Sequence, residues 1–154
     1  MKTNTHSLGF VIGQVYTLSQ DDWDGFKATR IKSKAALIGL AIDVFAKRHA
    51  LAEGAIISTT YAEWDAERDG IHYDFKSFSK NSISVSEAEM FFSEKLIANG
   101  GRMIHVLFEQ LGDDNFKFRG YIDFADLHAA GKLCESQYQG FYYSLNVIDR
   151  FVFA

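Results

Sequence analysis

Apolar residues recur along the chain at two different spacings, and these spacings predict the order of its elements. Residues 31–50 carry them three and four positions apart, which is the spacing of a helix with one buried face. Residues 55–65 and 70–78 are rich in β-branched and aromatic types and are joined by a short charged turn ending in Asp-Gly. We therefore predict a long helix followed by a hairpin.

The second half of the chain continues with strand and helix signals. Ser86 is followed three residues later by Glu89, a capping box that predicts a helix ending near Asn99. Residues 82–85, just before that helix, can extend the sheet. The remaining predicted elements are strands at 10–18, 103–111 and 116–124, a short helix at 125–132, and one or two strands within 140–154. This order predicts a mixed β-sheet flanked by helices, an α/β or α+β fold in a single domain over residues 1–154.

Length and composition exclude several classes of protein. The 154 residues, 47% of them hydrophobic and 23% charged, suit one globular domain with its own core. The single Cys134 excludes an internal disulfide and fits a reducing compartment. The longest apolar stretch, about twelve residues and interrupted by Asp43, is too short to span a bilayer, and the N-terminus lacks a secretory signal. We expect a soluble, cytoplasmic protein with no membrane partner.

The net charge of −4 conceals an asymmetry. Residues 27–48 hold six basic residues and one acidic residue, whereas residues 63–74 hold five acidic residues and one arginine. A basic element beside an acidic pocket is what a metal-dependent enzyme acting on a phosphate backbone needs. Two solvated faces of opposite sign would give the same asymmetry, so charge alone leaves both interpretations open.

Strand geometry sharpens the interpretation of the acidic segment. A hairpin with a four-residue turn, Glu67–Gly70, would pair Ala66 with Ile71 and Glu63 with Asp74. Because strand side chains alternate between faces, apolar and polar residues then separate. The apolar face would carry Ala62, Trp64, Ile71, Tyr73 and Phe75, and the other face Tyr61, Glu63, Asp65, His72, Asp74 and Lys76.

Two carboxylates directly opposite each other on a sheet repel, and a divalent cation would resolve that repulsion. Mg²⁺ takes one or two protein carboxylates and completes its shell with water and substrate phosphate oxygens. Lys76, two residues after Asp74, points to the same face, where it would orient the attacking water or offset developing negative charge.

The stretch DAERDGIHYDFKS at 65–77 resembles the signature of the PD-(D/E)xK nuclease superfamily, and its residue order is similar to that of type II restriction endonucleases. The family's helix, hairpin, helix, strand order extends the resemblance over about residues 30–111. The resemblance implies that Asp65 and Asp74 bind Mg²⁺, with Mn²⁺ as a substitute, and that the carbonyl of Phe75 is a further ligand. Lys76 would assist the water nucleophile. Glu63 competes with Asp65 for the role of first acid.

The resemblance therefore implies a restriction-endonuclease-like fold and a Mg²⁺-dependent endonuclease that hydrolyses phosphodiester bonds in DNA. The family often adds an acid from its first helix, and Asp43 is the candidate here. Lys80, Asn81 and Ser82 follow the site and would contact phosphates or bases, although an ordinary polar loop has the same composition. The basic segment 27–48 is a further candidate for backbone contact.

Two expectations about partners accompany this prediction. A homodimer is expected if the enzyme cuts both strands, because two-fold substrates favour two-fold proteins. The competing hypothesis is a non-enzymatic interaction protein of the inhibitor or immunity type, whose acidic residues dock on a basic partner. A nuclease needs Asp74 and Lys76 specifically, whereas a docking protein needs only negative charge.

Overall fold

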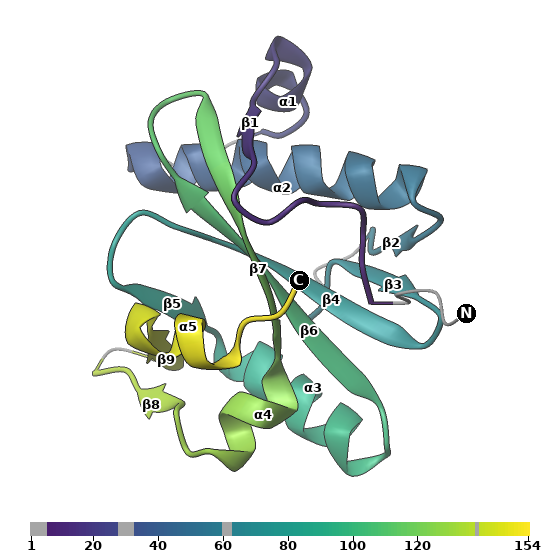
Figure 1. Ribbon diagram of the computed structural model, residues 1–154, viewed down its shortest axis with the longest axis vertical. Coiled ribbons are helices and arrows are strands. Elements are labelled where there is room, and N and C mark those ends of the chain that lie inside the picture. Colours follow the sequence, from purple (N-terminus) through teal and green to yellow (C-terminus); the bar gives the residue numbers. More distant parts are fainter. Residues whose placement is uncertain (1–5, 28–32, 60–62, 138) are drawn as a thin grey trace.

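The computed structural model describes residues 6–27, 33–59, 63–137 and 139–154, and it shows a mixed α+β fold (Figure 1). Among these residues, six strands form the main sheet in the order β1-β7-β6-β4-β3-β2, and three form a small sheet in the order β5-β9-β8. The strands are β1 (Val15–Thr17), β2 (Ile56–Ile57), β3 (Ala66–Arg68), β4 (Ile71–Phe78), β5 (Ser82–Val85), β6 (Arg102–Gln110), β7 (Asn115–Asp123), β8 (Cys134–Glu135) and β9 (Phe141–Ser144). The helices are α1 (Gln20–Asp24), α2 (Lys34–Ala52), α3 (Glu87–Ala98), α4 (Phe124–Ala129) and α5 (Ile148–Phe151), with a 3₁₀ turn η1 (Leu145–Val147).

Strand β4 is the centre of the architecture because it joins two kinds of pairing. It runs antiparallel to β3 and parallel to β6, from Ile71 opposite Arg102 to Phe78 opposite Glu109. Parallel neighbours need a crossover connection, which β5 and α3 supply. The predicted order of helix, hairpin, helix and strand is therefore confirmed.

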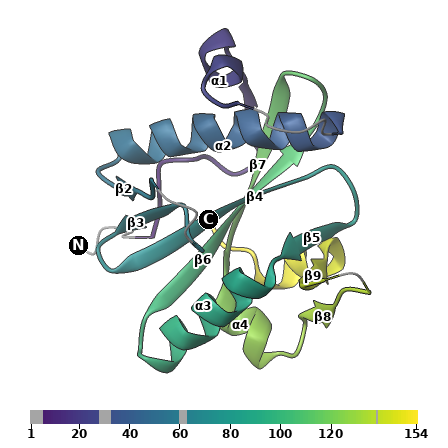
Figure 2. The ribbon, with the colours of Figure 1, turned by 180° about the vertical axis from the view of Figure 1, so that it is seen from behind.

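The main sheet is covered on both faces (Figures 1 and 2). Helix α2 packs on one face, and α3, α4 and the small sheet pack on the other. The alternation along β4 follows this division, since Ile71, Tyr73 and Phe75 pack in the core beneath α2 and Phe78 packs in the opposite core. Each face of β4 is thus shielded from water, which affects every charged residue that it carries.

Helix α2 confirms the longest predicted helix. It begins after the N-cap Ser33, whose side chain accepts the N–H of Ala36, and runs to Ala52. Its buried residues are Ile38, Ala41, Ile42, Ala46 and Ala50. Gly39 lets the helix approach β4, because a Cβ there would stand only 2.9 Å from the hydroxyl of Ser77. Ile31, which the prediction included, lies outside the described residues.

The predicted hairpin register is wrong by two residues. The turn contains only Asp69 and Gly70, with φ of 53° and 80°, so Arg68 pairs with Ile71 and Ala66 with Tyr73. An Asp-Gly pair adopts this double left-handed turn, whose twist matches that of the flanking strands. A shift of two leaves the paired residues, 66–68 and 71–73, on their predicted faces. Tyr61 and Ala62 lie outside the described residues.

Two other local predictions are also wrong, and a third is confirmed only in part. Trp64 packs in the core on the α3 side with its ring 5.2 Å from that of His72, because the chain bends before β3 begins. Strand β5 pairs with β9 rather than extending the main sheet. The chain end forms β9 but then turns helical over 145–151, where Val147 and Ile148 are buried.

Across the described ranges, no helix is both long enough and apolar enough to cross a membrane.

Candidate active site

The site begins where β3 and β4 part. Strand β3 starts at Ala66, whereas β4 continues to Phe78, so the β3-facing edge of β4 is open beyond Tyr73. The carboxylate of Asp65 fills the first position of this edge, because its Oδ2 accepts the N–H of Phe75 at 2.7 Å. The N–H and C=O of one strand residue point to the same side. The carbonyl of Phe75 therefore faces the same edge as Asp65.

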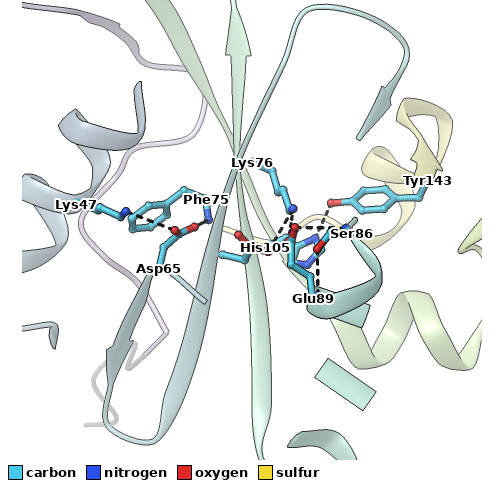
Figure 3. Close-up of polar contacts among 9 residues, drawn as sticks. Lys47, Asp65, Phe75, Lys76, Ser86, Glu89, His105 and Tyr143 are labelled. Atoms are coloured by element: carbon cyan, nitrogen blue, oxygen red, sulfur yellow. Dashed lines mark hydrogen bonds and ion pairs between the residues drawn. The ribbon is translucent and has the colours of Figure 1, made fainter. Parts of the chain in front are cut away.

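Asp74 and Lys76 project from the α3-facing side of β4, beside that edge. Asp74 is buried, and its Oδ2 lies 3.3 Å from Nζ of Lys76. Glu89, in the first turn of α3, takes a hydrogen bond from the same Nζ through its Oε2. Figure 3 shows Lys76 and Glu89 pointing toward each other. One buried ammonium group thus serves two carboxylates that come from β4 and α3.

The two carboxylates of this cluster differ in their hold on a proton. Burial raises the pKa of Asp74 well above its usual value, and the charges of Glu89 and Asp65 add to that rise, although Lys76 lowers it. Burial also raises the pKa of Glu89, but hydrogen bonds from Asp74 and Lys76 and the charge of Lys76 outweigh it and lower the pKa to about 2. Glu89 is therefore the permanent anion of the pair, and Asp74 is the group that exchanges a proton.

Lys76 stays charged in spite of its burial. Burial lowers its pKa, but the charges and hydrogen bonds of Asp74 and Glu89 more than compensate, so its pKa is raised. Lys76 can therefore donate hydrogen bonds and offset negative charge, but it cannot accept a proton near neutral pH.

A buried histidine on β6 and a buried tyrosine on β9 lie beside the cluster. The hydroxyl of Tyr143 lies 2.9 Å from Nδ1 of His105, and Nε2 of His105 has no hydrogen-bond partner among the described residues. Burial and the charge of Lys76 lower the pKa of His105 to about 3, against the opposing charge of Glu89. His105 is thus a neutral side chain that links β6 to β9.

Asp65 also has a partner on the other side of the sheet. Its Oδ1 lies 3.7 Å from Nζ of Lys47, which lies 2.9 Å from Oδ2 of Asp43, both from α2. Burial and the charge of Asp65 raise the pKa of Asp43, while Lys47 lowers it. Lys47 therefore links Asp43 of α2 to Asp65.

The other predicted residues lie around this centre. With the corrected register, Asp65 rather than Glu63 comes beside Asp74, and Glu63 lines a separate cavity with Phe91 and Lys95 of α3. Lys80, Asn81 and Ser82 are exposed. The described basic residues of the 27–48 segment include three that pair with acids, Lys34 with Asp113, Lys47 with Asp43, and Arg48 with Asp22. Arg30 and Lys32 lie outside the described residues.

Sequence reasoning missed Glu89 as part of the site. The capping box that identified it is present, since Glu89 accepts the N–H of Ser86 at 3.3 Å through Oε1. Its second oxygen reaches Lys76. The helix signal explained the residue fully, so nothing in the sequence demanded a second role.

The donor set suits a hard cation with few protein ligands. In the part of the chain that the structure describes, no three His, Cys, Asp or Glu side chains form a ready metal-binding group. The available donors are the carboxylates of Asp65 and Asp74 and the carbonyl of Phe75, which is as many protein ligands as Mg²⁺ commonly uses. The raised pKa of Asp74 supports this fit, because a buried carboxylate with acidic neighbours gains most from a cation.

Comparison of the chain with protein-family models, with curated proteins and with solved structures found no match. The assignment of function therefore depends on the geometry of the site.

Proposed function

We propose that this protein is a Mg²⁺-dependent endonuclease that hydrolyses phosphodiester bonds in DNA, with a restriction-endonuclease-like core. The observation that carries the proposal is the placement of Asp74 and Lys76 on one face of β4, beside the edge where Asp65 accepts the N–H of Phe75. Asp74 is buried and the side chain of Lys76 is only 12% exposed. The order α2, β3, β4, α3, β6 supports it, because it follows the family order implied by residues 65–77.

The residues of the site would have different roles. Asp65, Asp74 and the carbonyl of Phe75 would hold the cation, and Mn²⁺ would substitute for Mg²⁺. The bound cation would supply Lewis-acid stabilisation of phosphoryl oxygens and a more acidic water. Lys76, kept protonated by its two carboxylates, would orient the attacking water and stabilise negative charge on the phosphate.

A groove beside Lys76 supports nucleic acid as the substrate. Lys76 and Glu89 line a cavity of about 480 Å³ together with Ser82 and Ser84. The same two serines line a neighbouring cavity of about 440 Å³, which extends past Lys80 to the first turn of α2. Small hydroxyl groups and a lysine are suitable donors to phosphate and sugar oxygens. The loop predicted to contact DNA therefore borders the groove that leads to Lys76.

The docking hypothesis is less well supported, because Asp74 is buried while the other acidic residues of 63–74 are partly or fully exposed. An electrostatic docking patch must present its charges to solvent, because the partner meets them there. Asp74 is buried and shares Lys76 with Glu89, so it presents no charge to a partner at the surface.

Nicking of supercoiled plasmid tests the proposal. Wild-type protein with Mg²⁺ or Mn²⁺ should convert the plasmid to open-circular or linear form, and EDTA should stop the reaction. Asp74→Ala should lower the rate by about two orders of magnitude or more. Asp126→Ala is the matched control, since it removes an exposed carboxylate from α4, outside the site, and should leave the rate unchanged.

Equal nicking by wild type and Asp74→Ala would show that the cleavage comes from another source and would remove the site assignment. Absence of cleavage together with no measurable metal binding would favour the docking protein. Linear plasmid formed in a single encounter of enzyme and DNA, together with a solution mass twice that of one chain, would support the expected homodimer.

A further inference from the structure

A second group of opposite charges lies between α2 and the start of β3. Nζ of Lys47 is 2.9 Å from Oδ2 of Asp43, one turn earlier on the same helix, and 3.7 Å from Oδ1 of Asp65. The Lys47 side chain is only about one-third exposed, with a relative accessibility of 31%. One ammonium group is thus placed between two carboxylates from different elements.

Asp65 is shared between this group and the proposed metal site. Its Oδ2 is directed to the N–H of Phe75 at the edge of β4, and its Oδ1 is directed to Lys47. Figure 3 shows Lys47, Asp65 and Phe75 connected in this order. A carboxylate with one oxygen toward each of two neighbouring positions is the arrangement by which two-metal phosphodiesterases bridge their ions.

We propose that the ammonium group of Lys47 occupies a second cation position, between Asp43 and Asp65, that would otherwise take a second divalent ion. The inference rests on the proposed function, and it assigns to the enzyme a single exchangeable metal ion. Asp43 and Asp65 repel each other without a cation between them. A lysine on the same helix is tethered there at a high effective concentration, so a free ion must displace it.

This arrangement distinguishes the two lysines of the site. Lys76 lies on the α3 side and is directed to Asp74, beside the groove. Lys47 lies on the α2 side and contacts Asp43 and Asp65. Lys47 therefore acts as a positioning residue, which fixes Asp65 and sets the number of metal ions.

Counting bound Mn²⁺ on the full chain tests the proposal. Equilibrium dialysis and the loss of the free Mn²⁺ electron paramagnetic resonance signal should give one ion per wild-type chain and one more ion in Lys47→Gln. Arg48→Gln is the matched control, because it removes the same charge one residue along α2, where Arg48 pairs with Asp22 at 3.0 Å. That variant should bind the same number of ions as wild type.

A second variant keeps the test valid if Lys47→Gln changes the folding of the chain. The double variant Lys47→Gln with Asp43→Asn should lose the additional ion, because Asp65 alone remains at the second position. Thermal unfolding with and without Mn²⁺ should show the larger metal-dependent rise of Tm in Lys47→Gln.

The gain of an ion in Lys47→Gln decides the inference, and the wild-type ion decides the proposed function. Equal ion counts in wild type and Lys47→Gln, or two ions in wild type, would overturn the inference. A wild-type ion that Asp74→Asn fails to remove would overturn the proposed metal site but not the role of Lys47. No ion in wild type and one ion in Lys47→Gln would likewise overturn the proposed metal site but not the role of Lys47.

Discussion

The two lysines of the candidate site, Lys47 and Lys76, have similar partners and different surroundings. Each lies between two carboxylates, Lys47 between Asp43 and Asp65, and Lys76 between Asp74 and Glu89. The side chains of Lys76 and Asp74 are 12% and 9% exposed, whereas those of Lys47 and Asp43 are 31% and 30% exposed. Burial, more than the number of ion pairs, therefore decides how much each cluster contributes to stability.

Water has opposite consequences for the two clusters. A partly exposed pair is screened and contributes little to stability, so its members can exchange partners at small cost. A buried pair is costly to break, because the charge left behind has neither water nor a partner. The cluster of Lys76, Asp74 and Glu89 is therefore expected to contribute more to the stability of the fold than the cluster of Lys47, Asp43 and Asp65.

Replacing each lysine by methionine should give the largest difference between the clusters. Lys76→Met leaves Asp74 and Glu89 facing each other in the interior and should lower the free energy of unfolding by about 3 kcal/mol. Lys47→Met removes a partly solvated pair and should cost about 1 kcal/mol or less. Urea unfolding followed by circular dichroism at pH 7 measures both.

Methionine keeps most of the length of lysine, so the loss of packing is small in both variants. Equal losses in the two variants would contradict the distinction between the clusters. A smaller loss for Lys76→Met at pH 4 than at pH 7 would support its cause, because protonated Asp74 no longer repels Glu89.

Much of the fold could be predicted because its signals are local. The spacing of apolar residues over 31–50 and the capping box at Ser86 identify α2 and α3 without reference to the rest of the chain. The register of the hairpin could not be fixed in the same way. A four-residue and a two-residue turn give the same faces, and only the left-handed conformation of Asp69 selects between them.

In the candidate site, too, local sequence signals predict some contacts and not others. Asp74 and Lys76 are two residues apart on one strand, so their common face follows from the sequence. The contact of Glu89 with Lys76 depends on how closely α3 packs on β4 and β6, and the contact of His105 with Tyr143 depends on the small sheet. Both are tertiary contacts between elements distant in the sequence, and no periodicity predicts them.

Separating the two roles of Glu89 should give an effect of intermediate size. Glu89→Gln keeps an oxygen for the N–H of Ser86 but removes the charge that holds Lys76, and it should cost about 2 kcal/mol at pH 7. Ser86→Ala removes the cap and leaves the contact with Lys76, so it should cost about 1 kcal/mol. Urea unfolding of the two variants beside wild type gives both values.

The pH dependence distinguishes these two losses. The folded-state pKa of Glu89, about 2, is below its unfolded value of 4.5, so its stabilisation is present above pH 4.5 and is lost as the pH falls through about 2. The cost of Glu89→Gln should therefore shrink between pH 5 and pH 3, while the cost of Ser86→Ala stays constant. A cost of Glu89→Gln that is independent of pH would reduce Glu89 to a helix cap.

The smallest expected change in the free energy of unfolding is an increase, and it comes from replacing Asp74. Its folded-state pKa is raised well above the unfolded value of 3.8, chiefly by burial, so the folded protein binds this proton more tightly than the unfolded chain does. The stability that Asp74 contributes is therefore full below pH 3.8 and is lost as the pH rises through the raised folded value.

Asp74→Asn, which can still donate a hydrogen bond to Glu89, should stabilise the protein at pH 8 by on the order of 1 kcal/mol while it abolishes cleavage. The difference in free energy of unfolding between variant and wild type, measured at pH 4 and at pH 8, should grow with pH. A site residue whose removal strengthens the fold is retained for what it binds, whereas destabilisation at both pH values would make Asp74 a structural partner of Lys76.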